Sequence, residues 1–273
     1  MCKELSLEEI HKETLNVLRK IDEICKVNNI KYNIMYGTLL GYVRHNGYIP
    51  WDDDMDITML RPDYDKFIAY CKNYEDEILP FKLFSKETQD DYPFNIPRFC
   101  DTRFRMVKTD GLKDAGMGLF IDIYPLDGLG TVKDKDKKNI EKKKTFWMRC
   151  LGCAYSDKIM GSSNSFIKAI LRLPIYVYAH IRGAQYFLEK FELLSKKYSY
   201  DESKYVGILA WDFLVTYYEK EWMENLEDIV FEGVETLAPV ESKKVLEEEY
   251  GDYMKLPPEE DRKPYHEYLI YRK

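Results

Sequence analysis

Residues 31–60 read KYNIMYGTLLGYVRHNGYIPWDDDMDITML, and this stretch decides the fold. Its first part, residues 31–37, has the apolar character of a short buried strand, and a helix with Thr38 as its N-cap follows. Apolar residues resume in a second strand over residues 54–60, directly after a run of acidic residues. Gly37-Thr38 is therefore expected at a turn from strand to helix, shortly before a strand that begins with carboxylates.

The flanking sequence continues this mixture of helices and strands. Before it, Ser6 and Glu9 form a capping-box pattern, and apolar residues recur at helical spacing up to Asn28-Asn29, which predicts an amphipathic first helix. After it, a helix is expected over residues 64–73. Further strands are expected at residues 81–86, 94–101, 104–109 and 118–126. This pattern indicates an α/β (α+β) protein with a mixed sheet.

The composition changes after about residue 130. Residues 133–144, KDKDKKNIEKKK, carry seven Lys against three acidic residues, and the stretch that follows to about Lys197 predicts helices with aromatic and aliphatic faces. We therefore expect a core at residues 1–130, a helical lobe at 131–210, and a C-terminal segment at 211–273 that returns to the active site.

Charge and cysteine usage exclude some functional classes. A net charge of −7 over 273 residues argues against a protein that binds nucleic acid, which would need a basic face. The first residues lack an apolar signal core and no run of 18 apolar residues follows, so we expect a cytoplasmic protein, with the inner face of the cell membrane as an alternative location. The scattered cysteines predict reduced thiols, and Cys150 and Cys153 lack the second ligand pair of a zinc site.

The acidic run WDDDMD (51–56) carries the clearest chemical signal. Asp54 and Asp56 are two residues apart on an expected strand, so their carboxylates project from the same face. Two converging carboxylates repel each other unless a positive charge lies between them. A divalent cation with oxygen ligands, Mg²⁺ or Mn²⁺, is the simplest such partner. A solvated acidic turn is the alternative for this pair alone.

Asp122 adds a third carboxylate. It lies within the apolar run GLFIDIYPL (118–126), where an Asp is costly to bury unless it is paired or metal-bound. Together Asp54, Asp56 and Asp122 form the set that a metal-assisted phosphoryl transfer needs, because the cation neutralises phosphate oxygens and aligns the donor for in-line attack. A structural Asp that caps a strand end is the alternative for Asp122 alone.

The run YGTLLGYVRHNGYIPWDDDMDI (36–57) resembles the signature of the LicD family, bacterial phosphocholine transferases related to fukutin and fukutin-related protein and placed among enzymes with the nucleotidyltransferase fold. The resemblance extends to RFCDTRFRMV (98–107), GLFIDIYPLDG (118–128), FEGVETLAP (231–239) and YGDYMKLPP (250–258). It spans nearly the whole chain, and the helical middle is the least matched part.

The resemblance implies a nucleotidyltransferase-like mixed sheet core with a helical lobe. In that fold a Gly-Ser or Gly-Gly pair, a DxD strand and a later strand Asp form the site. These match Gly37-Thr38, Asp54 with Asp56, and Asp122. Thr38 departs from the common Ser but keeps a hydroxyl. We therefore expect Gly37 and Thr38 to shape a phosphate-binding loop for the donor, and the aspartates to hold Mg²⁺ or Mn²⁺.

The family's donor class implies an attack by a sugar hydroxyl on the distal phosphorus of a CDP-alcohol, with CDP-choline favoured. CMP would leave, and phosphocholine would remain on a cell-surface glycan such as lipopolysaccharide or a teichoic acid precursor, carried on lipid or not. Three alternatives stay open. One is transfer of phosphoethanolamine, ribitol phosphate or a phosphonate; another is nucleotidyl transfer; the third is a non-catalytic glycan-binding protein.

Several arginines are further candidates for the donor site. Arg44 is expected to clamp a phosphate and balance charge, because a guanidinium makes two-point contacts with phosphate. Arg98, Asp101 and Arg103 lie on an expected hairpin, where they would either read the nucleotide or pair with each other.

Two tail residues, Arg262 and His266, resemble family positions that return near the site. Arg262 is expected to contact the donor, and His266 to take a catalytic role. The general base is not assigned, because Asp122 and His266 both qualify and a metal-bound alkoxide would need neither.

Aromatic and basic residues raise two further hypotheses. A choline headgroup would be held by aromatic faces, for which Tyr36, Tyr48 and Tyr124 are candidates, with core packing as the alternative. The Lys-rich run, with residues 146–155 and 165–183, would lay a basic and aromatic face on an anionic membrane as a peripheral contact. A solvated helix packed against the core is the alternative.

Overall fold

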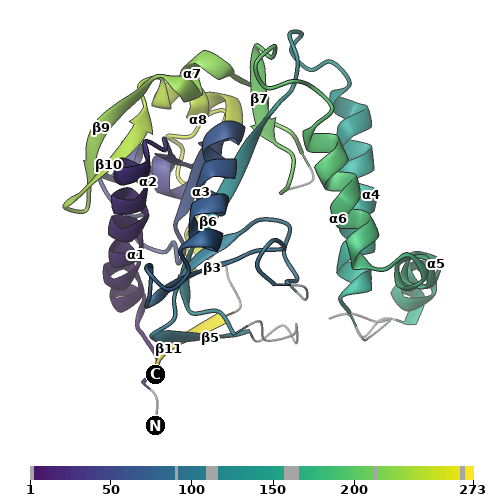
Figure 1. Ribbon diagram of the computed structural model, residues 1–273, viewed down its shortest axis with the longest axis horizontal. Helices are drawn as coiled ribbons and strands as arrows, with labels where there is room; N and C mark the ends of the chain where they lie inside the picture. Colours follow the sequence, from purple (N-terminus) through teal and green to yellow (C-terminus); the bar gives the residue numbers. More distant parts are fainter. Residues whose placement is uncertain (1–2, 90–91, 109–115, 157–165, 212–213, 265–267) are drawn as a thin grey trace.

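A mixed sheet lies at the centre of the computed structural model, which describes residues 3–89, 92–108, 116–156, 166–211, 214–264 and 268–273 (Figure 1). Its main path runs in the order β1 (Asn33–Ile34), β2 (Asp56–Leu60), β6 (Leu119–Gly128), β4 (Arg98–Asp101) and β3 (Phe81–Phe84). Beside the far half of β6 lies β7 (Tyr205–Ile208), which also pairs with β8 (Tyr218–Glu219). The expected α/β class with a mixed sheet is confirmed.

The strand pairing aligns residues that lie far apart in the sequence. β2 and β6 run parallel with Asp56 opposite Asp122, and β4 runs antiparallel to β6 with Arg98 opposite Asp122. Side chains alternate between the two faces of a sheet, so these three polar residues share one face. Their immediate neighbours Ile57 and Ile123 point to the other face, which carries the hydrophobic core.

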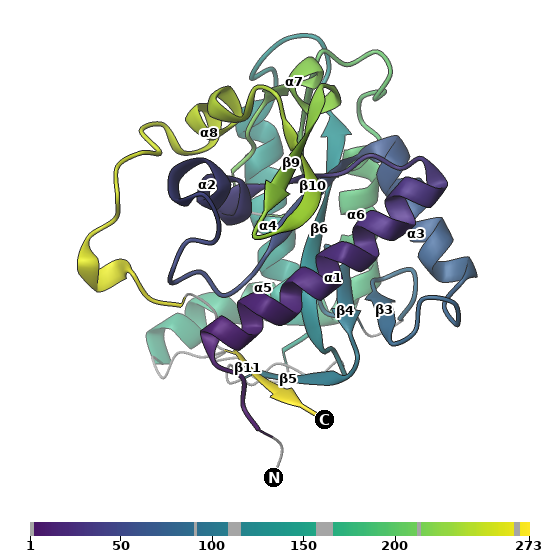
Figure 2. The same cartoon turned by 90° about the vertical axis from the view of Figure 1, so that its left-hand side faces the viewer.

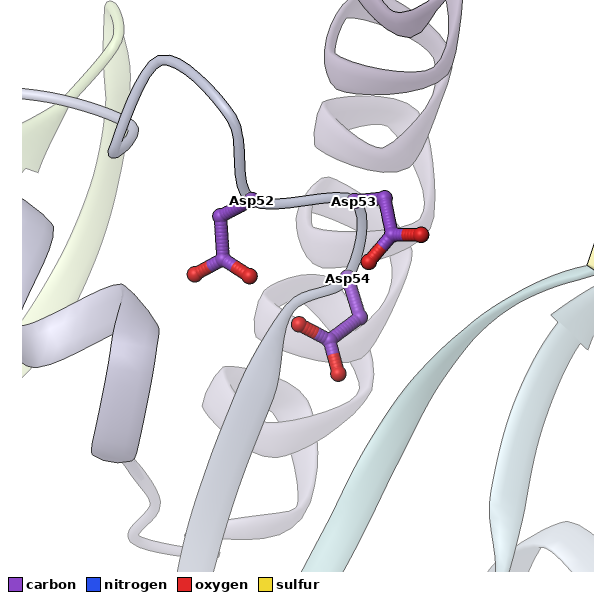
Figure 3. A group of neighbouring side chains, drawn as sticks. All are labelled: Asp52, Asp53 and Asp54. Atoms are coloured by element: carbon purple, nitrogen blue, oxygen red, sulfur yellow. The ribbon is translucent and has the colours of Figure 1, made fainter. Parts of the chain in front are cut away.

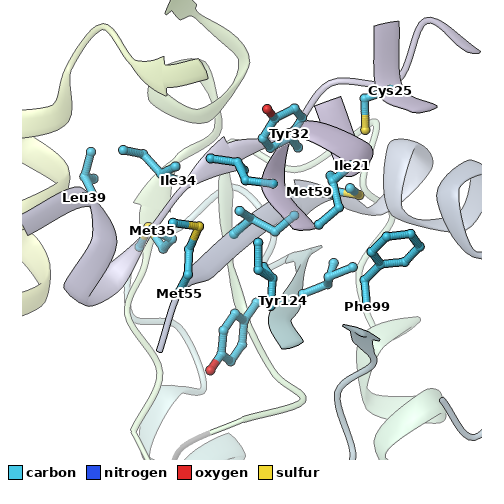
Figure 4. Packing of buried hydrophobic residues seen from close by; sticks show 14 of the residues in the cluster. Ile21, Cys25, Tyr32, Ile34, Met35, Leu39, Met55, Met59, Phe99 and Tyr124 are labelled. Carbon is cyan, nitrogen blue, oxygen red and sulfur yellow. The ribbon is translucent and has the colours of Figure 1, made fainter. Parts of the chain in front are cut away.

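Helices α1 (Leu7–Asn28) and α3 (Arg61–Asn73) cover that apolar face. Ile21 and Cys25 of α1, Met59 of β2 and Phe99 of β4 lie in the same cluster, which Figure 4 shows from close by. The expected capping box is confirmed: Ser6 accepts a hydrogen bond from the Glu9 backbone, and the Glu9 side chain accepts one from Ser6. α1 crosses the sheet obliquely in Figure 2.

Helix α2 (Tyr36–His45) begins three residues earlier than the sequence predicted. The expectation that Thr38 is its N-cap was wrong, because the N-cap is Met35 and Thr38 lies inside the first turn. The Thr38 hydroxyl serves a tertiary contact instead: it accepts a hydrogen bond from the backbone N–H of Asp56 at 2.9 Å. The contact fixes the start of α2 to the start of β2.

The helical lobe consists of α4 (Lys137–Ala154), α5 (Phe166–Arg182) and α6 (Ala184–Ser195). These helices pack on one another around a cluster of their own that includes Cys150, Cys153 and Phe187, and both cysteines are free thiols. β7 follows the lobe and returns to the central sheet. Among the described helices, none is long and apolar enough to cross a membrane.

The C-terminal part closes the other side of the molecule. It contains α7 (Lys220–Glu224), a hairpin of β9 (Leu226–Phe231) and β10 (Val234–Pro239), α8 (Ser242–Tyr250) and a 3₁₀ turn (Glu259–Asp261). The last strand, β11 (Tyr268–Arg272), pairs with β5 (Phe104–Lys108) at the end of the molecule where both termini lie (Figure 1).

Candidate active site

The sheet register brings the predicted aspartates together. Asp56 on β2 lies directly opposite Asp122 on β6, and Asp54 stands two residues before Asp56 in the loop that enters β2. One carboxylate oxygen from each of Asp54, Asp56 and Asp122 lies within 4.8 Å of the others. The three carboxylates therefore converge, as the sequence predicted, although Asp54 precedes the strand instead of belonging to it.

Asp56 and Asp122 lie side by side on neighbouring strands and, with Asp54, form a carboxylate row. Arg98 continues this row on the next strand, β4. Its Nε donates to Oδ1 of Asp122 at 2.6 Å, and its guanidinium lies between the rings of Phe94 and Phe120, each 4.1 Å from the ring centroid. Burial lowers the pKa of Arg98, but the charge of Asp122 and their hydrogen bonds raise it more, so the net shift is upward. The positive charge of Arg98 is thus committed to Asp122, a partner that the sequence did not predict.

Asp56 is the least compensated member of the row. It is buried, and among the described residues its Oδ1 has no hydrogen-bond partner. Burial raises the pKa of Asp56 well above its ordinary value, and the charges of Asp54 and Asp122 raise it further. An unsatisfied buried carboxylate oxygen beside two other carboxylates fits a divalent cation with oxygen ligands.

The loop before β2 carries a second acidic group, Asp52, Asp53 and Asp54, which fan out from one turn of chain in Figure 3. Asp52 lies against the start of α2, where a Cβ added at Gly37 would overlap its Oδ2. The glycine of the Gly37-Thr38 pair thus makes room for a carboxylate, and the threonine holds Asp56 in place.

Aromatic residues border the carboxylates. The ring of Tyr124 packs edge-on against Tyr36, with centroids 5.1 Å apart, and against Trp211, at 6.2 Å. Tyr124 lies close enough to Asp56 to lower the pKa of that carboxyl slightly, against the stronger effect of burial. Tyr48 differs: its ring stacks on His11 with centroids 4.0 Å apart, and its hydroxyl donates to the His11 carbonyl.

Comparison with known proteins decides the family. Residues 29–149 match the family described as LicD/FKTN/FKRP, nucleotidyltransferase domain. The chain is also 30% identical over 272 residues to the lipopolysaccharide cholinephosphotransferase LicD of Haemophilus influenzae, which covers 97% of each protein. The chain belongs to the LicD family. This confirms the resemblance in the sequence, and the protein is an enzyme of the phosphotransferase class.

Shorter matches involve two uncharacterized proteins of Rickettsia. One from Rickettsia prowazekii and one from Rickettsia typhi are each 51% identical over 61 residues, which cover 22% of this chain. These matches cover 20% and 18% of the two rickettsial proteins, so they carry no argument about the whole molecule.

The structure places the other LicD-like arginines around, rather than within, the carboxylate row. Arg44 donates from Nη1 to the carbonyl of Tyr253 at 2.8 Å, and burial lowers its pKa. Arg103 makes a close ion pair with Asp101 at the turn between β4 and β5, with Nη2 and Oδ2 2.6 Å apart. The pairing that the sequence offered as an alternative is therefore found between Arg103 and Asp101, whereas Arg98 pairs with Asp122.

The tail returns to the acidic loop of this LicD-family enzyme. The guanidinium of Arg262 lies over the ring of Trp51, 5.8 Å from its centroid, next to the start of the acidic run. Tyr268 on β11 donates its hydroxyl to the Asp53 carbonyl at 3.0 Å. His266 lies outside the described residues, so its predicted role is not placed.

Two tyrosines of the tail respond to charges of the site although the sequence did not assign them a role. Tyr250 is 43% exposed, yet partial burial and the negative charge of Glu249 raise the pKa of its hydroxyl, with a smaller effect from Asp56. Tyr268 similarly lies near Asp54. The abundance of Tyr in the sequence hides such residues, because only the return of the tail distinguishes them from core tyrosines.

Proposed function

We propose that this LicD-family enzyme transfers phosphocholine from CDP-choline to a hydroxyl of a cell-surface glycan and releases CMP. The observation that supports it most is the convergence of Asp54, Asp56 and Asp122, with an unsatisfied buried oxygen on Asp56. The Haemophilus relative, named for cholinephosphate transfer to lipopolysaccharide, supports the headgroup and the acceptor class. A teichoic acid precursor offers the same hydroxyl chemistry.

Asp54, Asp56 and Asp122 would hold Mg²⁺ or Mn²⁺. When bound, such a cation neutralises phosphate oxygens and stabilises the charge on the leaving nucleotide. Arg98 keeps Asp122 in its position by the bonds described above and balances its charge. The chain thus presents an acidic row whose net negative charge is suited to a cation and a polyphosphate donor together.

The donor would lie between the start of α2 and the returning tail. Gly37 and Thr38 form that start, and we assign them to the phosphate loop. Arg44 donates to the Tyr253 carbonyl of the tail, and Arg262 of the tail lies over the ring of Trp51. Both arginines supply positive charge beside the phosphate loop. Arg103 pairs with Asp101 at a hairpin turn, so a donor contact from it would require this pair to open.

The headgroup would meet the aromatic border of the site. Tyr36 and Tyr124 lie beside Asp56, and the faces of such rings attract a quaternary ammonium group. Tyr48 is the least suited of the three tyrosines, because His11 already stacks on its ring.

For the proton of the acceptor hydroxyl, His266 is the better of the two candidates for the general base. Asp122 already accepts hydrogen bonds from Arg98 through both of its oxygens, at 2.6 and 3.4 Å. Asp122 is thereby committed to Arg98 and to the proposed cation, whereas His is the side chain that most often serves as a general base.

The first test measures donor binding, which needs no known acceptor. Thermal shifts are recorded with Mg²⁺ and CDP-choline, CDP-ethanolamine, CDP-ribitol or CTP, where a ligand at about 100 times its Kd stabilises by about 2.7 kcal/mol. A metal-dependent shift with CDP-choline is expected, and it should vanish in Asp54→Ala. Asp76→Ala, which replaces an exposed Asp in the turn after α3, is the matched control.

The outcomes separate the alternatives. A selective shift with another CDP-alcohol would change the headgroup, and a shift with CTP alone would favour nucleotidyl transfer. Absence of any nucleotide shift would count against catalysis itself. Product analysis then identifies the attacked phosphorus, because headgroup transfer releases CMP whereas nucleotidyl transfer releases pyrophosphate or a displaced headgroup phosphate.

A further inference from the structure

The outer face of α5 carries a stripe of exposed apolar side chains, which an ordinary surface helix lacks. Ile170, Pro174, Val177 and Ile181 follow one another at intervals of three or four residues and are all exposed, so they form one continuous stripe. Leu171 and Leu173 flank the stripe, and the exposed fractions reach 73% for Leu171 and 77% for Ile181.

The inner face of the same helix is also largely apolar, since Ile175 and Tyr176 pack against the cluster of the lobe, and it carries one polar contact. Arg172 points toward α4, where its Nε donates to the Sγ of Cys153 at 3.2 Å, and Ala179 is fully buried against the lobe. A helix in water normally turns its charges outward and its apolar side chains inward. α5 is therefore built for an outer environment that is less polar than water.

The charges of α5 indicate which environment this is. Its sequence, FIKAILRLPIYVYAHIR, contains Lys168, Arg172, His180 and Arg182 and no acidic residue, although the whole chain has a net charge of −7. Arg182 is exposed at the end of the stripe, near the rings of Tyr178 and Tyr186. A basic helix with an apolar outer face fits an anionic lipid surface.

Neighbouring residues of α4 extend this surface. Phe146 is exposed and lies 6.1 Å from the ring of Tyr178, and Arg149 is exposed three residues further along α4. Aromatic rings beside basic side chains are typical of the zone between lipid headgroups and acyl chains. The Lys-rich run is less suited to this role than the sequence suggested, because Lys144 is buried and Lys133 pairs with Glu248.

The position of α5 sets it apart from the central sheet. In Figure 1, α5 lies at the outer end of the helical lobe, with α4 and α6 between it and the sheet. A second copy of the chain is the less suitable occupant, because two such helices would bring their basic residues together.

We propose that α5, with Phe146 of α4, docks the enzyme peripherally on a bilayer that contains anionic lipid. The helix would lie in the plane of the interface, with Ile170, Leu171, Val177 and Ile181 among the acyl chains and Arg182 at the headgroups. This inference does not depend on the proposed reaction, because it concerns a surface apart from the carboxylate row.

The test is flotation with vesicles of phosphatidylglycerol and phosphatidylcholine, and with vesicles of phosphatidylcholine alone, without donor or metal. The wild type should bind the anionic vesicles, and Leu171→Asn/Ile181→Asn should bind them at least about tenfold more weakly. The matched control is Val27→Asn/Val230→Asn, which replaces residues that are 78% and 63% exposed elsewhere and should bind like the wild type.

A further variant tests the role of charge, and thermal shifts report whether that variant is folded. Arg182→Gln should weaken binding to anionic vesicles, as should added salt, and should leave donor-induced thermal shifts unchanged. Absence of binding by the wild type, or equal binding by Leu171→Asn/Ile181→Asn, would overturn the proposal. A wild-type dimer that this double variant dissociates, without vesicle binding, would assign the face to a second copy and overturn it as well.

Discussion

The carboxylate face of the sheet and the outer face of α5 depart from ordinary protein chemistry in opposite directions. The sheet buries Asp56, Asp122 and Arg98, whereas α5 exposes Ile181 and its apolar neighbours. In the sheet, each charge lies opposite another charge because the strand register fixes it there. In the lobe, the outward apolar residues of α5 are exposed. Each region points to a partner of matching character, a cation with a phosphate donor for the first and a lipid surface for the second.

A buried lysine of α4 joins the two regions. Lys144 of α4 is fully buried, and its Nζ donates to the carbonyls of Ile208, Trp211 and Leu214 at 3.1, 2.9 and 3.0 Å. Trp211 in turn packs against Tyr124 beside Asp56. One buried ammonium group thus connects the lobe to the aromatic border of the site.

The largest effect is expected from Asp56→Asn, which tests whether the sheet keeps its buried charge for function. Loss of a metal ligand should remove several kcal/mol of transition-state stabilisation, on the order of 10³-fold in CMP release. The same variant should be more stable than the wild type in thermal denaturation without metal, because the repulsion among Asp54, Asp56 and Asp122 is relieved. Asp76→Asn should change neither quantity, and a destabilised Asp56→Asn would contradict this account.

Arg98→Met comes next, because it leaves Asp122 buried without its partner. Removal of one member of a buried pair costs about 3–5 kcal/mol, and we expect a loss of this size in urea denaturation. Since the remaining negative charge is then larger, added Mg²⁺ should restore part of the stability. Arg19→Met, an exposed arginine on α1, is the control. If Arg98→Met lost as little free energy of unfolding as the control, the carboxylate row would not need the positive charge of Arg98.

Lys144→Met tests the junction between the two regions. Hydrogen bonds to charged groups contribute about 1.5–3 kcal/mol each, and the burial of an ammonium group offsets part of this, so a net loss of about 2–4 kcal/mol is expected. Limited proteolysis should cut the connection between lobe and sheet faster than in the wild type. Lys143 is the exposed neighbour of Lys144 on α4, and Lys143→Met should change neither the free energy of unfolding nor the rate of cleavage. Equal cleavage rates would mean that the junction rests on other contacts.

The smallest effect concerns pH, at the end of β6 remote from the carboxylate row. Asp127 lines a cavity of about 470 Å³ with Arg61 and Phe191, and burial raises its pKa to about 6 against the opposing charge of Arg61. The folded protein therefore keeps this proton longer than the unfolded chain does. From about pH 4 to about pH 6 the Asp127 contribution to stability must fall as pH rises, by at most about 3 kcal/mol.

The readout is the difference in free energy of unfolding between the wild type and Asp127→Asn, measured at several pH values. This difference should decline between about pH 4 and 6 and stay level above that range. A difference that rises with pH would show that Arg61 holds the Asp127 carboxylate in its charged form more strongly than burial opposes it.

The sequence by itself determined the local elements and the chemistry of the site. The capping box at Ser6 and the alternation around Asp56 depend on neighbours in the chain, so they were predictable. So was the set of Asp54, Asp56 and Asp122, because an Asp in an apolar strand needs a partner. The LicD signature added the family, which the comparisons confirmed.

Only the tertiary structure decided which residues contact one another. The sequence could not show that Arg98 lies opposite Asp122, since strand register depends on the whole sheet. Nor could it show that Thr38 binds the Asp56 backbone instead of capping its own helix. The outward turn of the apolar stripe on α5 was equally hidden: periodicity reveals that a helix has an apolar face, but only packing decides whether that face meets the core or the surroundings.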